Sequence, residues 1–191
     1  MRHFHVIGLA ATLAATIAAQ EFKLGAKVAD FPLQSTTGET VQFDSLKGPV
    51  TVITFVSTEC PVSNAYNERM ASLYNEYGTK GVKFVFINSN SNEPAAKVAE
   101  HASKNFPFAV YKDDANTVAD RFGATVTPEV FVMDKNGTVV YHGSIDDSQE
   151  PARVTQHRLK GALDSVLAGR TVATPESKAF GCTIKRVKKQ S

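Results

Sequence analysis

The stretch from Val50 to Pro61, VTVITFVSTECP, decides the fold class of this 191-residue chain. Its first part, Val50–Val56, is an almost unbroken run of β-branched and aromatic side chains, which is typical of a strand buried on both faces of a parallel sheet. Pro61 then stands where a helix can begin, because the first helical position needs no N–H group. Cys60 therefore lies between a core strand and the start of a helix.

Strands and helices alternate along the rest of the chain. The patterns predict strands at 31–34, 41–43, 82–87, 108–111, 129–133 and 138–142, and helices at 61–77, 93–104, 115–122 and 153–167. Such an order is typical of an α/β domain with helices on both faces of a mixed sheet. We therefore expect one α/β domain with a central mixed β-sheet flanked by helices, an N-terminal β-hairpin extension and an irregular C-terminal tail.

Composition and charge exclude several classes of protein. Hydrophobic residues make up 42% of the chain and charged residues 21%, so it is neither a disordered tail nor a membrane bundle. The formal net charge of +2 gives no reason to expect a nucleic-acid partner, because binding phosphates needs a concentrated basic surface. Two cysteines exclude a disulfide-dense scaffold and a four-cysteine zinc site.

Residues 1–19 resemble a targeting segment. A short polar start precedes an apolar run, Val6–Ala19, that is too short to span a bilayer comfortably and ends in small residues. This pattern predicts a signal peptide cleaved after Ala18 or Ala19, and hence an exported protein (periplasmic or extracellular) whose mature form has no transmembrane span. A retained anchor or an ordinary amphipathic helix is the alternative. Export would place both cysteines in an oxidising compartment.

Cys60 is the candidate nucleophile. At a helix start, unpaired N–H groups and the positive end of the helix dipole favour a thiolate, which is the reactive form of cysteine. The neighbouring carboxylate of Glu59 would act against this by raising the thiol pKa. The alternative is a small buried residue that fills the corner between strand and helix.

Four segments carry a family resemblance. Phe55–Tyr66, FVSTECPVSNAY, resembles the active-site turn of thioredoxin-fold redoxins, the alkyl hydroperoxide reductase/thiol-specific antioxidant family and its TlpA-like relatives. Thr127–Asp134, TPEVFVMD, is similar to their cis-proline loop, while Tyr141–Asp147 and Gly181–Ile184 resemble an exported bacterial branch of the family. The likeness covers roughly 22–184, essentially the whole mature chain.

The resemblance implies a thioredoxin-like redoxin domain over residues 22–169, followed by a tail over 170–191 that carries Cys182. It also implies that Pro128 is cis and lies against Cys60, an arrangement usually reserved for tight functional loops. Pro61, Thr127 and Pro128 would then dock the substrate, with the exposed backbone of Thr127 pairing with an extended segment. The alternative for Pro128 is a plain loop proline.

The chain departs from the family at several positions. Dithiol members have a second cysteine three residues after the first, where this chain has Ser63. True peroxiredoxins have a proline at the position of Ile53 and a threonine or serine at that of Ser57, and only the second condition is met. Their peroxide-polarising arginine has no clear counterpart here. Thiol–disulfide exchange is therefore favoured over reduction of hydroperoxides.

Cys182 is the candidate partner of Cys60. A tail can fold back over the turn, and a distant resolving thiol would close a disulfide after Cys60 is oxidised. A static structural disulfide and an unpaired thiol that bridges two chains are the alternatives.

The sequence thus predicts an exported thiol-dependent oxidoreductase that needs no cofactor. Its partners would be a protein thiol or disulfide, or a small peroxide, together with an external thiol reductant. The alternatives are a peroxiredoxin-like hydroperoxide reductase and a non-catalytic binding module. The module would dock a partner protein, or carry copper on Cys60 and Cys182 with His142 as a further ligand. Asp146 and Asp147 are expected to cap the helix near Arg153 or to lie in solvent, and Asp113 and Asp114 to form a turn and helix cap.

Overall fold

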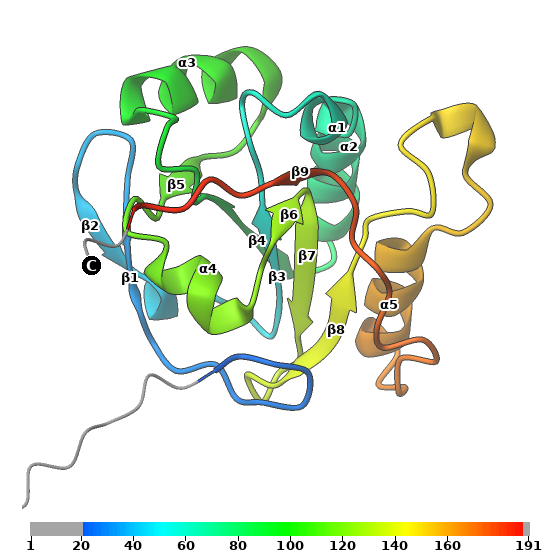
Figure 1. The fold of residues 1–191 in the computed structure, drawn as a ribbon. Helices are drawn as coiled ribbons and strands as arrows, with labels where there is room; N and C mark the ends of the chain where they lie inside the picture. Colours follow the sequence, from blue (N-terminus) through cyan, green and yellow to red (C-terminus); the bar gives the residue numbers. More distant parts are fainter. Residues whose placement is uncertain (1–20, 189–191) are drawn as a thin grey trace, which may run out of the picture.

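The structure of the chain, a computed structural model, describes residues 21–188 (Figure 1). The predicted signal peptide lies outside the described residues. The strands are β1 (Pro32–Gln34), β2 (Thr40–Gln42), β3 (Val50–Phe55), β4 (Val82–Asn88), β5 (Val110–Lys112), β6 (Val126–Thr127), β7 (Glu129–Met133), β8 (Val139–Gly143) and β9 (Cys182–Thr183). The α-helices are α1 (Pro61–Asn64), α2 (Asn67–Gly78), α3 (Ala95–Asn105), α4 (Thr117–Phe122) and α5 (Arg158–Leu167).

Seven strands form one mixed sheet in the order β2-β1-β5-β4-β3-β7-β8. Strands β3, β4 and β5 run parallel, while β7 pairs antiparallel with β3 and β8 with β7. The hairpin of β1 and β2 extends the sheet beyond β5. Every residue of β3 is buried, as its apolar sequence predicts for a central strand.

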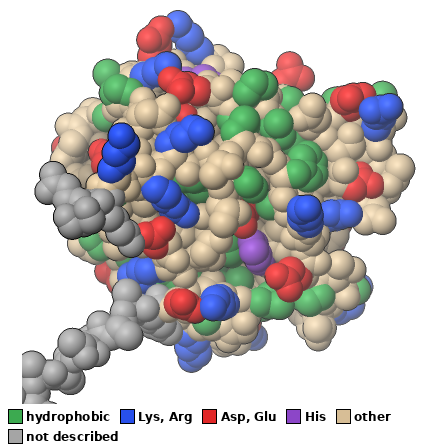
Figure 2. Space-filling view, in the orientation of Figure 1, with side chains coloured by type: hydrophobic (Ala, Val, Ile, Leu, Met, Phe, Trp, Pro, Cys, Tyr) green, Lys and Arg blue, Asp and Glu red, His purple; other side chains and the backbone are tan. Residues whose placement is uncertain are grey.

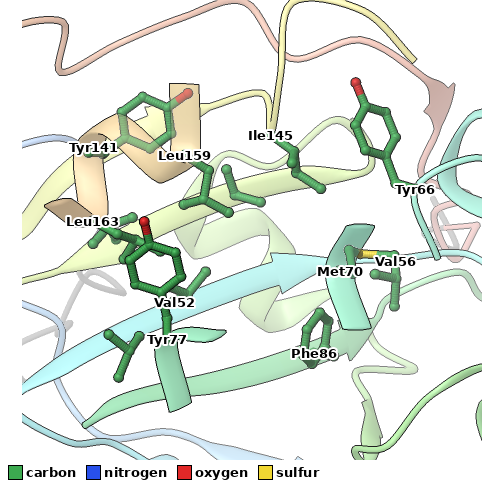
Figure 3. Close-up of a cluster of buried hydrophobic side chains, with 14 of the residues drawn as sticks. Val52, Val56, Tyr66, Met70, Tyr77, Phe86, Tyr141, Ile145, Leu159 and Leu163 are labelled. Carbon is green, nitrogen blue, oxygen red and sulfur yellow. The ribbon is translucent and has the colours of Figure 1, made fainter. Parts of the chain in front are cut away.

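Alternate residues of the central strands face two hydrophobic layers. Val52 and Phe86 belong to the layer that also holds side chains of α2, α3 and α5, and Figure 3 shows Tyr77 and Leu163 in the same cluster. Ile53 and Ile87 belong to the other layer, with side chains of α4 and of the N-terminal segment. Within residues 21–188, none of the helices is long and apolar enough to cross a membrane.

The four predicted helices are present with shifted limits, and two of them differ by more than two residues. The helix predicted over 61–77 is divided at Tyr66, whose side chain is buried and donates a hydrogen bond to the Ser148 carbonyl. The helix predicted over 153–167 begins only at Arg158, after a short 3-10 turn. Asp147 accepts hydrogen bonds from the N–H and hydroxyl of Thr155 and so holds the preceding segment outside the helix.

The C-terminal segment, residues 170–188, crosses the end of the sheet where the parallel strands finish (Figure 1). Its strand β9 pairs antiparallel with β6 and lies beside α1. Val172 and Ile184 contribute to the two hydrophobic layers, one to each. The segment is irregular, as predicted, but it is tied to the domain along its length.

Candidate active site

Cys60 lies at the N-cap of α1, directly after the central strand β3. Its sulfur accepts a hydrogen bond from the backbone N–H of Ser63 at 3.3 Å, and Pro61 occupies the first turn. The residue is 2% exposed. Ser63, which stands where dithiol relatives have a second cysteine, is itself buried, and its hydroxyl accepts from the N–H of Ser57.

The loop before β7 lies against this cysteine. The Thr127–Pro128 peptide bond is cis, and the Cys60 thiol donates a hydrogen bond to the Thr127 carbonyl oxygen at 3.2 Å. Thr127 is 1% exposed, and its hydroxyl has no hydrogen-bond partner within residues 21–188. The structure therefore brings Cys60 and the cis-proline loop together, in the arrangement that the resemblance implies.

Cys182 reaches the same place from the tail. In the β6–β9 pair Cys182 lies opposite Thr127, and its N–H donates to the Cys60 sulfur at 3.3 Å across a sequence separation of 122 residues. Both cysteines are free thiols. The expectation that the Thr127 backbone is exposed is wrong, because β9 of the same chain already pairs with it.

Gly181 makes this close approach possible. Its φ is +153°, and a Cβ atom at this position would lie 1.9 Å from the Thr127 carbonyl oxygen. A side chain therefore cannot be added without moving β9 away from β6. The glycine that precedes Cys182 thus has a direct part in bringing the two thiols together.

The surroundings of the two thiols set their pKa values in opposite directions. Burial acts to raise the pKa of Cys60, but hydrogen bonds from the Cys182 thiol and from the N–H groups of Ser63 and Cys182 outweigh it, so that this pKa lies below its ordinary value. The pKa of Cys182 is raised, because its thiol donates to Cys60 and is partly buried beside it. The Glu59 carboxylate points elsewhere, to Lys97 and Asn92.

We expect Cys60 to react with iodoacetamide at a lower pH than Cys182 does, because alkylation follows the thiolate population. Peptide mass spectrometry over a pH series gives the pH at which alkylation of each cysteine is half-maximal. For Cys60 this midpoint should lie below its value in the urea-unfolded protein, and for Cys182 it should lie above its own value in the unfolded protein. Equal midpoints for the two folded thiols would contradict the assignment of Cys60 as the more acidic thiol and the nucleophile.

A buried carboxylate behind the Cys60 turn escaped the sequence analysis, which placed Glu93 only at the start of a helix. Glu93 is 2% exposed and accepts hydrogen bonds from the Ser57 hydroxyl, from the N–H and hydroxyl of Thr58, and from the Asn88 amide, at 2.5–2.7 Å. Burial acts to raise its pKa, but these bonds hold the pKa below its usual range. The one sequence signal was the run of polar residues after β4.

Ser57 connects the Glu93 carboxylate to the backbone of Cys60. Its hydroxyl donates to Glu93 and accepts from the backbone N–H of Cys60 at 3.1 Å. Both of these hydrogen bonds of the hydroxyl therefore hold the turn in place.

The three candidate copper ligands do not form one group, because His142 does not join the two cysteines. Within residues 21–188, no three His, Cys, Asp or Glu side chains are grouped so that they could hold a metal ion, and this includes Cys60, Cys182 and His142. His142 instead pairs with the buried carboxylate of Glu129 at 2.6 Å and stacks on Phe131.

The acidic residues singled out in the sequence have structural partners. Asp113 accepts from the N–H groups of Val118 and Ala119 at the start of α4, which confirms the predicted cap. Asp146 does not cap a helix and is not in solvent: it is 4% exposed and pairs with Arg69 and His157. On the face drawn in Figure 2, basic and acidic side chains are intermingled.

Comparison with known proteins gives a family match and a similar curated protein. Residues 24–142 match the model of the AhpC/TSA family. A thiol-disulfide oxidoreductase ResA from Halalkalibacterium halodurans is 25% identical over 119 residues, which cover 62% of this chain and 66% of that protein, or just under two thirds of its length.

Two solved structures share the architecture. An uncharacterized conserved protein from Geobacillus kaustophilus aligns with a TM-score of 0.81 and 31% identity, over 88% of this chain and 95% of that one. The peroxidoxin BcpB from Mycobacterium tuberculosis aligns with a TM-score of 0.59 and 25% identity, over 78% and 96% of the two chains. These matches confirm the predicted thioredoxin-like α/β fold.

Proposed function

The chain belongs to the AhpC/TSA family, and from that premise we propose that it catalyses thiol–disulfide exchange, with Cys60 as the nucleophile and Cys182 as the resolving thiol. The observation that carries the proposal is the hydrogen bond from the Cys182 N–H to the Cys60 sulfur, between two cysteines that are both free. A resolving thiol must lie next to the nucleophile so that the bond can form and open in each cycle, and the position of Cys182 satisfies this.

The proposed cycle balances as two successive exchanges. The Cys60 thiolate attacks one sulfur of a substrate disulfide, forms a mixed disulfide and releases the first substrate thiolate, which takes up a proton. Cys182 then loses its proton and attacks the Cys60 sulfur, which releases the second substrate thiolate. The substrate gains two electrons and two protons, and the enzyme gains one disulfide, which an external dithiol reduces again.

Access to Cys60 requires a movement of the tail. The nucleophile is 2% exposed, and β9 occupies the backbone of Thr127 beside Pro128. In the proposed cycle a substrate would replace β9 on this edge, with Pro61 and the Thr127–Pro128 loop as its docking surface. Attack by Cys182 on the mixed disulfide would then return β9 to β6.

The geometry supports exchange better than reduction of hydroperoxides. The Ser57 hydroxyl, at the position where peroxiredoxins have a threonine or serine, donates to Glu93. Because this hydroxyl has one proton, it cannot donate to a peroxide oxygen at the same time.

The test exposes the reduced protein to a small disulfide such as oxidised glutathione, then alkylates the remaining thiols and measures the intact mass. We expect the wild-type protein to lose two hydrogen atoms and to take up no alkyl group as the Cys60–Cys182 bond forms, and Cys182→Ser to accumulate glutathione on Cys60. A parallel sample that receives a brief peroxide pulse tests the alternative function, reduction of hydroperoxides. If neither oxidant modifies the folded protein, the proposal of a redox function fails.

We also propose export, on the basis of the apolar run in residues 1–19. The same mass measurement on protein recovered from its native host tests this, because cleavage after Ala18 or Ala19 would remove the corresponding mass.

A further inference from the structure

Buried polar side chains fill the end of the sheet beneath the tail. They are Asn88 (0% exposed), Lys112 (1%), Asn116 (1%), Glu93 (2%) and Asn90 (3%). Buried polar groups are retained only with hydrogen-bond partners, so the partners of this cluster show what it holds in place. Some of these partners belong to the Cys60 turn, which gives one direction of contact, and others belong to the segment after Cys182, which gives a second.

The first direction is through Glu93, whose carboxylate binds Ser57 and Thr58 as described above. The second direction is through Asn90 and Asn116. The Asn90 side-chain oxygen accepts from the Lys185 N–H at 2.8 Å, and the Asn116 side-chain oxygen accepts from the Val187 N–H at 2.7 Å. The Ser91 N–H also donates to the Lys185 carbonyl at 3.0 Å.

Lys112 joins the two directions. Its ammonium group donates to the Asn88 side chain at 2.9 Å and to the carbonyls of Asn90 at 3.2 Å and Glu93 at 2.7 Å. Asn88 in turn donates to the Glu93 carboxylate. The loop from Asn88 to Glu93 is therefore held as one unit, and it contacts the Cys60 turn at one end and the tail near its middle.

We infer that Asn90 is a positioning residue for the reaction between Cys60 and Cys182, an inference that rests on the proposed function. Strand β9 is paired with β6 over two residues only, so its position depends on what fixes the chain on each side. Close packing at Gly181 holds the side before Cys182. On the side after it, the N–H of Ile184 bonds to the Thr125 carbonyl, and the N–H of Lys185, the next residue, bonds to Asn90. Disulfide formation tolerates little error in the separation of the two residues, so this anchor controls how readily the bond closes.

The remaining hydrogen-bonding capacity of Asn90 agrees with this role. Its amide nitrogen is buried and has no hydrogen-bond partner within residues 21–188, whereas its oxygen accepts from Lys185. An aspartate at this position keeps an acceptor oxygen for the Lys185 N–H and replaces the unpartnered nitrogen by a second oxygen. Its negative charge would lie near the Lys112 ammonium group, which donates to the Asn90 backbone carbonyl at 3.2 Å. Asn90→Asp is therefore a conservative variant that should preserve the anchor.

The experiment measures the equilibrium between the dithiol and disulfide forms of the full chain in glutathione buffers. In this reaction the two thiols pass two electrons and two protons to oxidised glutathione, which yields two molecules of reduced glutathione. We expect Asn90→Ala to lower the effective concentration of the Cys60–Cys182 pair about five- to tenfold, the size of one lost hydrogen bond, and Asn90→Asp to restore most of it.

Further variants keep the test decisive if Asn90→Ala folds poorly. Lys185→Pro removes the donor from the exposed tail and should lower the effective concentration by a similar factor, while Lys188→Pro makes the same change three residues further on and should not. Tyr77→Phe removes a partly buried hydrogen bond to Asp164 between α2 and α5, and should change the melting temperature but not the disulfide equilibrium.

Two outcomes would overturn the inference in distinguishable ways. If the wild-type protein forms no Cys60–Cys182 bond in these buffers, the proposed function fails and the inference fails with it. If the wild-type bond forms but Asn90→Ala and Lys185→Pro match the wild-type equilibrium, the inference alone is wrong.

Discussion

Cys60→Ser is expected to abolish thiol–disulfide exchange, with a fall in rate of at least about 1,000-fold, as for other enzymes that lose their nucleophile. A serine hydroxyl is not ionised near neutral pH and cannot form a disulfide. The mixed disulfide of the first step therefore cannot form, and Cys182 has no bond to attack in the second step. The measurement is the reduction of a protein disulfide by the variant in the presence of an external dithiol, compared with wild type.

The loss should be chemical and not structural. The Cys60 side chain caps α1 by accepting from the Ser63 N–H, and serine is one of the preferred residues at this position. We therefore expect the melting temperature of Cys60→Ser to stay close to that of the reduced wild-type protein. Exchange that persisted in this variant would show that another group is the nucleophile.

Gly181→Ala is expected to separate the two thiols without removing either. A Cβ atom would lie 1.9 Å from the Thr127 carbonyl oxygen, so β9 must move away from β6 and take Cys182 with it. We expect slower formation of the intramolecular disulfide by at least tenfold and a loss of about 1–3 kcal/mol of folding free energy, as for other substitutions that overfill a packed site. Stopped alkylation at timed intervals after addition of oxidised glutathione measures the rate.

Gly81→Ala is the matched control. Gly81 also has a positive φ, +86°, but a Cβ atom there meets no atom within 4 Å. The control should show the cost of the backbone conformation alone, with disulfide formation at the wild-type rate. If Gly181→Ala forms the bond as fast as the control does, close pairing of β9 with β6 is not needed for resolution.

The local features of the site were predictable because short-range chemistry determines them. The apolar run from Val50 identifies a central strand, and Pro61 identifies the helix start that places Cys60 at an N-cap. The cis conformation of Pro128 followed from the resemblance of its loop to a known family, and the structure contains it.

The polar support of the site was not predictable in the same way. In the sequence Asn90 looks like an ordinary loop residue and Glu93 like the start of a helix, since a polar run after a strand is usually solvated. Glu93 is buried because it binds the Cys60 turn, and the tail binds Asn90 through the backbone N–H of Lys185, a group that every residue other than proline carries. The helix break at Tyr66 has a similar origin, in a hydrogen bond to the distant Ser148.

By itself, the sequence determined the central strand, the capped cysteine and the order of strands and helices, because periodicity, capping and turn residues act over a few positions. Only the tertiary structure decided that Cys182 lies against Cys60, that β9 covers the Thr127 backbone, and that one buried loop holds both. The physical reason is that these contacts join segments up to 122 residues apart through backbone groups and close packing at a glycine, which carry no periodic signal along the chain.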